Sequence, residues 1–217
     1  MKVVNFAETN SLVSKYMSEL RDVNIQKDSL RFRRNLERIG EIMAYEISKT
    51  LNYKTVPVTT PLGIAKCQVH DEQLVLATIF RAGLPFHQGF LNYFDSAENA
   101  FVSAYRKYRD PENFDIFIEY IASPLLEGKT VIVADPMLAT GSSMELACTA
   151  FLTKGVPKTM HLACVIASQQ AVDYIAKAFV HEDITLWVGA IDPDLNDHSY
   201  IVPGLGDAGD LSFGEKE

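Results

Sequence analysis

Nine consecutive residues that follow a short apolar run have the composition of a phosphate-binding loop. The run Thr130–Ala134 predicts a buried strand, and it leads through Asp135 into small and hydroxylated residues. Small residues let backbone N–H groups approach a phosphate closely, and a helix that begins near Ser142 adds a favourable dipole. Ligands of open α/β sheets gather at the carboxyl ends of strands, so this loop predicts phosphate binding. The loop consists of Asp135, Pro136, Met137, Leu138, Ala139, Thr140, Gly141, Ser142 and Ser143.

An ordinary strand-to-helix connection would have a similar composition. Thr140 or Ser142 could simply cap the helix, and Asp135 could cap the turn that follows it. The nearby segment 128–130 (Gly-Lys-Thr) is not a nucleoside triphosphate loop, because Ser123 stands where that loop needs a glycine and a strand follows. Taken alone, the loop leaves phosphate binding and helix capping open.

The elements that must hold this loop are predicted from the apolar pattern. Uninterrupted apolar and β-branched runs suit strands buried on both faces of a parallel sheet, and helices fit between them. Before them, Asp28–Leu51 has apolar residues at helical spacing, and the stretches Thr55–Gly63 and Ile64–Val69 predict a β-hairpin. The fold class is therefore α/β, with a central, mostly parallel sheet flanked by helices. The predicted strands are Leu74–Phe80, Ala100–Ala104, Phe114–Ile121, Thr130–Ala134, Met160–Ala167 and Ile184–Ala190, and the predicted helices are Phe86–Phe94, Ser142–Lys154 and Gln169–Val180.

Size, charge and cysteine usage narrow the class of protein. The chain has 217 residues, 47% of them apolar, which suits one globular domain with a sizeable core. Its net charge of −8 argues against broad binding to nucleic acid or acidic membranes. Cys67, Cys148 and Cys164 lack the spacing of a disulfide framework or a zinc site, and no apolar run approaches the roughly 18 residues of a membrane span. We therefore expect a cytoplasmic protein without a membrane segment.

Three motifs together resemble the uracil phosphoribosyltransferase family. They occur in the order of the family and at similar spacing, and the resemblance runs from about Lys27 to Gly214, which leaves the first twenty-odd residues outside it. It implies a type I phosphoribosyltransferase-like fold with an N-terminal helix, a β-hairpin and a C-terminal hood loop. We expect a single domain over residues 1–217, with hood elements at about 1–25 and 192–217. The motifs are Arg81-Ala82-Gly83-Leu84, the loop 135–143, and Tyr200-Ile201-Val202-Pro203-Gly204-Leu205-Gly206-Asp207-Ala208-Gly209-Asp210.

The resemblance implies transfer of ribose 5-phosphate from 5-phospho-α-D-ribose 1-diphosphate to uracil, which gives UMP and diphosphate in pyrimidine salvage. Positive charge develops on the sugar and negative charge on the diphosphate as the C1–O bond breaks, so fixed cations matter more than a nucleophile. Arg81 matches a diphosphate-binding arginine of the family, with a surface salt bridge as the alternative reading. Arg106 matches a second one, with Lys107 and Arg109 as substitutes. Asp135 would accept hydrogen bonds from the ribose hydroxyls.

The C-terminal motif would form a hood that reads the base. Backbone groups of Ile201, Gly206 and Ala208 would complement the two carbonyl groups and the N3–H of uracil, with Tyr200 beside them. Cytosine would leave buried groups unpaired at about 1–3 kcal/mol each. Asp207 matches an acidic residue near the sugar and the base, and its role between the two stays open. A simple turn is the alternative reading of its motif.

The family also implies partners and a cofactor. We expect Mg²⁺ held by substrate oxygens and water, with no direct protein ligand. The partners would be small-molecule substrates, without nucleic acid or membrane, and a second copy of the chain in a homodimer or larger homo-oligomer. GTP binding comes into consideration through the same resemblance.

The chain departs from the family pattern at a few positions. Ser142 replaces a second glycine of the phosphate loop, where a serine adds a hydrogen-bond donor. Pro85 and the pair His87-Gln88 replace a glycine-rich run, which could reshape the diphosphate loop. Two other readings remain: a phosphoribosyl-binding regulator of pyrimidine genes, which the acidic charge disfavours, and a phosphoribosyltransferase for another base, which would lack the hood motif.

Overall fold

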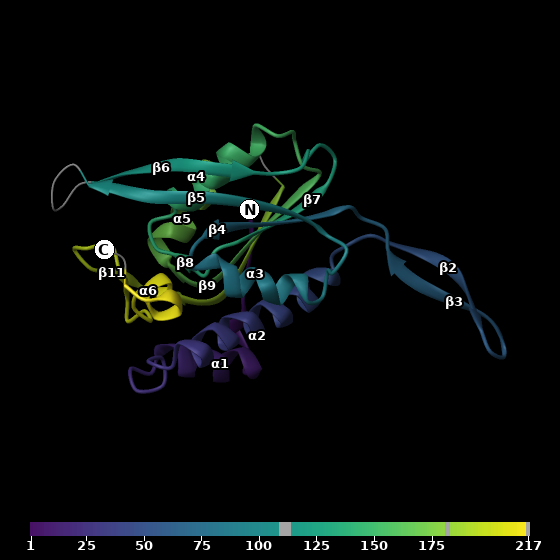
Figure 1. Cartoon of the computed structure of the whole chain (residues 1–217), viewed down its shortest axis with the longest axis horizontal. Coiled ribbons are helices and arrows are strands. Elements are labelled where there is room, and N and C mark those ends of the chain that lie inside the picture. Colours follow the sequence, from purple (N-terminus) through teal and green to yellow (C-terminus); the bar gives the residue numbers. More distant parts are fainter. Residues whose placement is uncertain (109–113, 181–182, 216–217) are drawn as a thin grey trace.

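The computed structural model of the protein describes residues 1–108, 114–180 and 183–215, and side chains outside 104–118. A central sheet has the strand order β1-β10-β9-β7-β4-β5-β6, and β8 adds to β9. Every pairing in it is parallel except that of β5 with β6 (Figure 1), so the predicted fold class is confirmed. The strands are β1 Lys2–Asn5, β4 Leu74–Phe80, β5 Glu98–Tyr108, β6 Phe114–Ala122, β7 Thr130–Ala134, β8 Met137–Leu138, β9 Thr159–Ser168 and β10 Ile184–Asp192.

Helices cover both faces of this sheet. One apolar cluster joins the sheet to α1, α2 and α3, and a second joins the opposite face to α4 and α5. Both clusters are built from buried side chains, because the central strands are apolar on both faces. None of the helices in the described part of the chain is long and apolar enough to cross a membrane. The helices are α1 Leu12–Arg21, α2 Ser29–Ser48, α3 Gly83–Leu91, α4 Ser142–Leu152, α5 Gln169–Ala178 and α6 Ala208–Phe213, with a short 3₁₀ turn η1 at Phe6–Glu8.

One predicted strand differs in its direction and environment. We expected Phe114–Ile121 to be a buried strand of the parallel sheet, but β6 is antiparallel to β5 and lies at the edge of the sheet. Only five residues separate the two strands in the sequence, and a parallel crossover needs a dozen or more. Strand β5 also continues beyond Ala104 to Tyr108.

The first 21 residues hold elements that the polar composition concealed. Strand β1 pairs with β10 at the edge of the sheet, so the start of the chain, which we expected in the hood, belongs to the sheet. Helix α1 packs on α2 and buries Val13, Met17 and Leu20, while most of its other residues are exposed. Its narrow apolar stripe was easy to miss.

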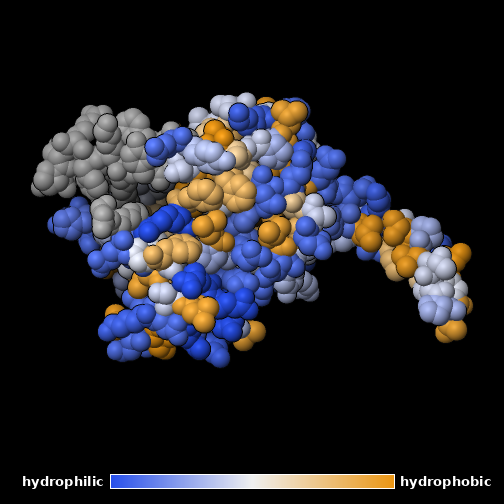
Figure 2. Space-filling view, viewed as in Figure 1, coloured by the Kyte–Doolittle hydropathy of each residue, from blue (hydrophilic) through white to orange (hydrophobic). Residues whose placement is uncertain are grey.

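The predicted hairpin is confirmed as an arm that projects away from the sheet. It consists of β2 Tyr53–Thr60 and β3 Gly63–His70, which pair with each other and with no other strand of the described residues. Figure 1 shows the arm extending far from the rest of the molecule, and Figure 2 shows apolar side chains along it. Leu62 at its tip is fully exposed, and Ile64 is 76% exposed. This arm adds no residue to the sheet core.

Candidate phosphate and base site

The predicted phosphate loop and the Arg81 motif leave neighbouring strands at the same edge of the sheet. Strands β4 and β7 are parallel, with Thr78 beside Ala134, and the Thr78 hydroxyl donates a 2.9 Å hydrogen bond to the Ala134 carbonyl. A side chain at Gly83 would meet both groups, at 2.1 and 3.1 Å from its Cβ. Glycine at this position therefore lets the segment after Arg81 pass close to the start of the loop, beside Asp135.

The first half of the loop is fixed by strand β9. The N–H of Asp135 donates to the Ala163 carbonyl at 3.1 Å, and Val165 and Ile166 both donate to the Pro136 carbonyl at 3.0 Å. The Asp135 carboxylate has one long contact, at 3.5 Å, with the N–H of Met137. Burial raises the pKa of Asp135 to about 7 and outweighs that hydrogen bond. The carboxylate therefore lacks the partners that a purely structural turn cap would have.

The second half of the loop turns into helix α4 at Gly141. This glycine has a φ of +89°, in the left-handed region that glycine adopts most readily. Its carbonyl accepts a bond from the N–H of Glu145, while the Thr140 hydroxyl lies 3.2 Å from the Ser142 hydroxyl. Ser142 is the first helical residue, and Ser143 follows within the first turn. The hydroxyl groups thus gather at the positive end of the helix.

Arg81 is bound by the C-terminal hood. Its Nη2 lies 2.7 Å from a carboxylate oxygen of Asp210 and 3.0 Å from the Gly214 carbonyl. Its Nε is buried without a hydrogen-bond partner among the described residues. Both side chains of the ion pair are about one-third exposed, at 34% and 33%. The structure therefore brings together two of the three sequence motifs, and one guanidinium nitrogen remains unsatisfied.

The hood also touches the phosphate loop. The N–H of Ala208 points at the Met137 sulfur, 3.4 Å away, and sulfur is a weak acceptor. Asp207 caps α6 by accepting bonds from Gly209 and Asp210 at 2.8 and 3.0 Å, both through Oδ1. The turn-capping reading of Asp207 thus describes a real contact, and its second oxygen takes no part in the cap.

The remaining base-site candidates occupy different parts of the hood. Ile201 is buried in strand β12 (Ile201–Val202), which pairs with β11 (Asp194–Leu195). Gly206 is exposed and has a φ of +89°. The backbone of Tyr200 is bonded to Asn196 in both directions, at 2.9 Å each, and its side chain is 41% exposed. Between residues 192 and 215, the chain forms β11, β12 and α6.

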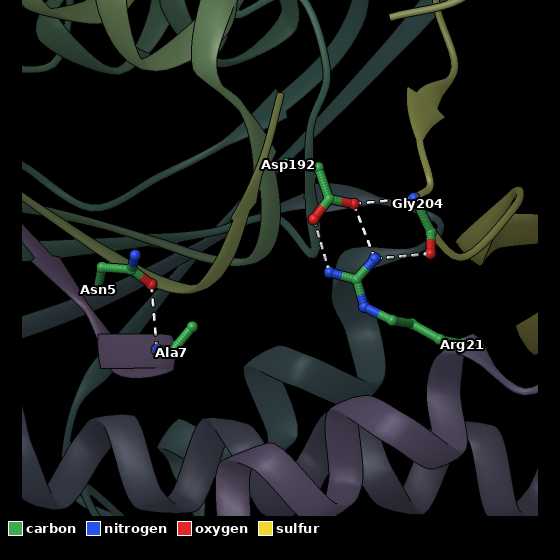
Figure 3. Close-up of polar contacts among 5 residues, drawn as sticks. All are labelled: Asn5, Ala7, Arg21, Asp192 and Gly204. Atoms are coloured by element: carbon green, nitrogen blue, oxygen red, sulfur yellow. Dashed lines mark hydrogen bonds and ion pairs between the residues drawn. The ribbon is translucent and has the colours of Figure 1, made fainter. Parts of the chain in front are cut away.

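An ion pair that the sequence reasoning missed anchors the hood. Figure 3 shows that Arg21, the last residue of α1, donates to both carboxylate oxygens of Asp192, at 2.7 Å each. The same carboxylate accepts the N–H of Gly204 at 2.8 Å, and Arg21 donates to the Gly204 carbonyl at 2.9 Å. Burial alone would raise the pKa of Asp192, but the bonds from Arg21 and Gly204 outweigh it and lower that pKa. The two charged residues lie 171 positions apart in the sequence, which left no local signal for this pair.

Helix α2 supports the hood from the same side. Arg33 donates to the Ser212 carbonyl at 2.6 Å, and its guanidinium lies 5.9 Å from the centre of the Phe213 ring. Gln26, just before α2, donates to the Leu205 carbonyl at 3.1 Å. The N-terminal helices thus position the hood without entering the site.

The second predicted arginine is described only through its backbone. Arg106 lies inside strand β5, opposite Ile116, and not in a loop after a strand. Its side chain and that of Lys107 lie outside the described side chains, and Arg109 lies outside the described residues. The role of Arg106 therefore stays a prediction.

The two departures in α3 are accommodated by the helix. This helix begins at Gly83, three residues earlier than predicted, so Pro85 stands in the first turn, where a missing N–H costs nothing. His87 is buried, with Nε2 2.8 Å from the Asn99 side-chain oxygen, and burial lowers its pKa. Pro85 is buried as well, whereas Gln88 is exposed and donates to the Asn92 side-chain oxygen at 2.8 Å.

Metal ligands do not cluster in the described part of the chain. No group of three or more His, Cys, Asp or Glu side chains there is arranged to hold a metal ion.

Comparison with known proteins identifies the family. The family model for uracil phosphoribosyltransferase matches residues 7–215, and a uracil phosphoribosyltransferase of Porphyromonas gingivalis is 63% identical over 216 residues, with both chains fully covered. A solved protein structure from Aquifex aeolicus superimposes with a TM-score of 0.86 at 30% identity and covers 98% of each chain. A hypoxanthine phosphoribosyltransferase structure from Staphylococcus aureus shares the fold, with a TM-score of 0.52 at 14% identity over 86% of this chain and 84% of its own.

These matches correct one expectation. We placed the first twenty-odd residues outside the resemblance, but the family match begins at residue 7. In the structure, helix α1 in this region belongs to the core and holds the hood through Arg21. The match covers all three motifs and the elements that bring them together. The chain therefore belongs to the uracil phosphoribosyltransferase family.

Proposed function

We propose that this protein transfers ribose 5-phosphate from 5-phospho-α-D-ribose 1-diphosphate to uracil and releases UMP and diphosphate. The observation that carries the proposal is the meeting of its three motifs at one edge of the sheet. Arg81 contacts Asp210 of the hood, and Ala208 of the hood contacts Met137 of the phosphate loop. Membership in the family supports the same activity.

The 5′-phosphate would bind at the start of α4. There the N–H groups around Gly141 and the hydroxyl groups of Thr140, Ser142 and Ser143 can donate to phosphate oxygens. The rest of the loop from Asp135 through Pro136, Met137, Leu138 and Ala139 would line the sugar side, as the sequence predicts.

The diphosphate leaving group would bind Arg81, with Arg106 as the second cation. Among the described residues, the buried Nε of Arg81 has no hydrogen-bond partner, and its Nη2 is held by Asp210 at the edge of the hood. A diphosphate oxygen could accept a hydrogen bond from Nε–H, and another could compete with Asp210 for Nη2. A guanidinium in this position would stabilise the negative charge that develops on the leaving oxygen.

The sugar and the base would each meet a carboxylate. Asp135 would accept hydrogen bonds from the ribose hydroxyls, since in the described part of the chain its carboxylate makes only one long contact. Asp207 would use its second oxygen toward the sugar ring or the base. Backbone groups of Tyr200, Ile201, Gly206 and Ala208 would read uracil, and the weak contact from Ala208 to sulfur could be exchanged for a uracil carbonyl.

Magnesium would be held mainly by diphosphate oxygens and water. Mg²⁺ usually keeps several waters beside substrate phosphates. The ion would neutralise charge on the diphosphate.

The setting of the enzyme is part of the same proposal. The cysteines are free, with Cys148 and Cys164 buried, which suits the reducing cytoplasm. The apolar hairpin arm suits contact with a second copy of the chain in a homodimer or larger oligomer. The net charge of −8 suits small-molecule substrates rather than nucleic acid. GTP binding stays a prediction from the family resemblance.

The direct test mixes purified protein with Mg²⁺, phosphoribosyl diphosphate and labelled uracil and measures UMP. We expect UMP from uracil and none above the blank from cytosine, adenine or hypoxanthine. Product from another base alone would replace the proposed acceptor, and no product from any base would overturn the enzymatic proposal.

A further inference from the structure

Two side chains near α5 contact the phosphate loop, and neither is used by the function proposed above. The first is Ser168, the last residue of β9, which is fully buried. Its hydroxyl donates to the Ala139 carbonyl at 2.6 Å and accepts the N–H of Ala171 at 2.9 Å, so it caps α5 as well. One hydroxyl therefore joins the phosphate loop to the start of a helix.

The bond to Ala139 sets the direction of the next N–H group. The C=O and N–H of one trans peptide point in opposite directions, so a carbonyl fixed on Ser168 turns the N–H of Thr140 away from α5. The described residues offer no hydrogen-bond acceptor to the N–H groups of Thr140 and Gly141. Backbone N–H groups need a partner, and phosphate oxygens would supply one.

The second side chain is Tyr174 on α5. Its ring lies so close to Gly141 that a Cβ added there would come within 2.7 Å of the ring. Its hydroxyl donates to the carboxylate of Glu145, which stands in the first turn of α4. Tyr174 thus packs against the left-handed turn and also ties down a negative charge that would otherwise be free to approach a bound phosphate.

We propose that Ser168 and Tyr174 are positioning residues for the 5′-phosphate. Ser168 holds the Ala139 carbonyl behind the loop, and Tyr174 holds Gly141 and Glu145. Together they keep the N–H groups of the loop directed at the phosphate. This inference rests on the proposed function, because it assigns the ligand of the loop.

A purely structural role makes a different prediction. Loss of the α5 cap or of ring packing would lower stability and weaken every ligand alike. Loss of positioning would weaken only ligands with a 5′-phosphate, because the diphosphate is assigned to Arg81 on a different strand. Binding of two separate probes distinguishes the two roles.

The experiment measures binding of ribose 5-phosphate and of Mg²⁺-diphosphate by titration calorimetry, together with thermal unfolding. Ser168→Ala and Tyr174→Ala should each weaken ribose 5-phosphate binding about 3- to 10-fold, the range expected for one lost hydrogen bond. Their affinity for diphosphate should stay within about twofold of the wild type, on the same scale. Arg81→Ala should show the reverse pattern.

Matched controls remove similar groups elsewhere. Ser11→Ala deletes the cap of α1, which accepts the N–H of Val13, and Tyr93→Ala deletes an exposed ring beyond α3. Both should bind the two probes as the wild type does. If Ser168→Ala fails to fold, Tyr174→Ala still decides the matter, because Tyr174 is 39% exposed.

Equal weakening of both probes in the Ser168 and Tyr174 variants, or unchanged binding of both, would overturn the positioning roles. Either result would leave the proposed function intact. A wild-type protein that binds neither probe would instead remove the proposed function itself.

Discussion

Asp135 and Arg81 are the two charged residues at the ends of adjacent parallel strands, and their surroundings differ. Burial raises the pKa of Asp135 to about 7, whereas Arg81 shares a hydrogen-bonded ion pair with Asp210. Without substrate, the site therefore holds a carboxylate whose pKa lies near neutral pH beside a guanidinium that already forms an ion pair. Both states should change when substrate binds, and each can be tested with a single substitution.

The first prediction concerns the pH dependence of binding through Asp135. Both carboxylate oxygens accept hydrogen bonds from ribose hydroxyls when the group is ionised, and protonation turns one of these acceptors into a donor. The affinity for phosphoribosyl diphosphate should therefore be highest above pH 7 and should fall as the pH drops through about 7. Calorimetry from pH 5.5 to 8.5, a range of about 1.5 units on either side of that pKa, measures the dissociation constant.

The control for this prediction is Asp135→Asn, which binds without a titrating group at that position. It should keep only the pH dependence that the substrate phosphates contribute, since these titrate near pH 6. Identical profiles for the two proteins would exclude Asp135 as the source of the dependence.

The second prediction concerns the leaving group. Arg81→Ala should lower kcat by about 10²- to 10³-fold, as loss of one donor to a developing negative charge does in other enzymes. Steady-state kinetics with saturating uracil measure it. Arg34→Ala is the matched control, because Arg34 makes an exposed ion pair with Glu37 on α2. Wild-type kinetics in Arg81→Ala would remove Arg81 from the site.

At the scale of elements, the hood is held by helices that lie at the other end of the sequence. Arg21 of α1 binds Asp192 and Gly204, and Arg33 of α2 binds the Ser212 carbonyl. The short helix α6 has only six residues and would be marginal alone. Its position beside Arg81 therefore depends on these contacts.

The third prediction follows from the Arg21 anchor. Arg21→Ala leaves the Asp192 carboxylate, 7% exposed, without its cation, and should lower the free energy of unfolding by about 3 kcal/mol in urea titrations. Lys49→Ala, which breaks an exposed pair with Glu46, should cost less than about 1 kcal/mol. A cost in Arg21→Ala no larger than in the control would show that the anchor contributes little.

The same pair has a defined pH dependence. The pKa of Asp192 is lowered in the folded state, so its contribution is fully present above the ordinary value of 3.8 and is lost as the pH falls through the lowered folded value. Arg21→Ala should therefore lose less stability than the wild type on acidification below pH 4, a limit set at about the ordinary pKa.

At the scale of the whole molecule, the hairpin arm is the feature that the fold of one chain does not explain. Its strands pair with each other and carry exposed apolar side chains at Val58, Leu62, Ile64 and Val69. An isolated two-stranded hairpin is marginal in water, and exposed apolar surface of this kind marks an interaction site. A second copy of the chain is the partner that we expect.

The fourth prediction tests that role. Replacing both Leu62 and Ile64 with Asp should reduce the mass in sedimentation or light scattering to that of one chain, 24.2 kDa, by placing charge on a buried contact. Leu125→Asp, at a site that is 73% exposed outside the arm, should keep the mass of the wild type. A single-chain mass for the wild type would contradict the predicted oligomer, and an unchanged oligomer in the double variant would show that the arm tip does not hold it.

The sequence by itself determined the central strands and the phosphate loop. Leu74–Phe80 and Thr130–Ala134 were predicted to the residue, because an unbroken apolar run is a local property that a strand buried on both faces requires. The motif at 135–143 and the hood motif could likewise be recognised in the sequence, since short loops that bind a phosphate or a base need particular residue types in a fixed order.

Only the tertiary structure decided which of these residues meet and what holds them. The ion pairs of Arg81 with Asp210 and of Arg21 with Asp192 join residues 129 and 171 positions apart, and the contact of Ser168 with Ala139 of the phosphate loop spans 29 positions. Such contacts follow from the packing of whole elements, and no window of local sequence contains both partners of these ion pairs. The sequence therefore shows which residue types can form the site, while the fold determines where those residues lie.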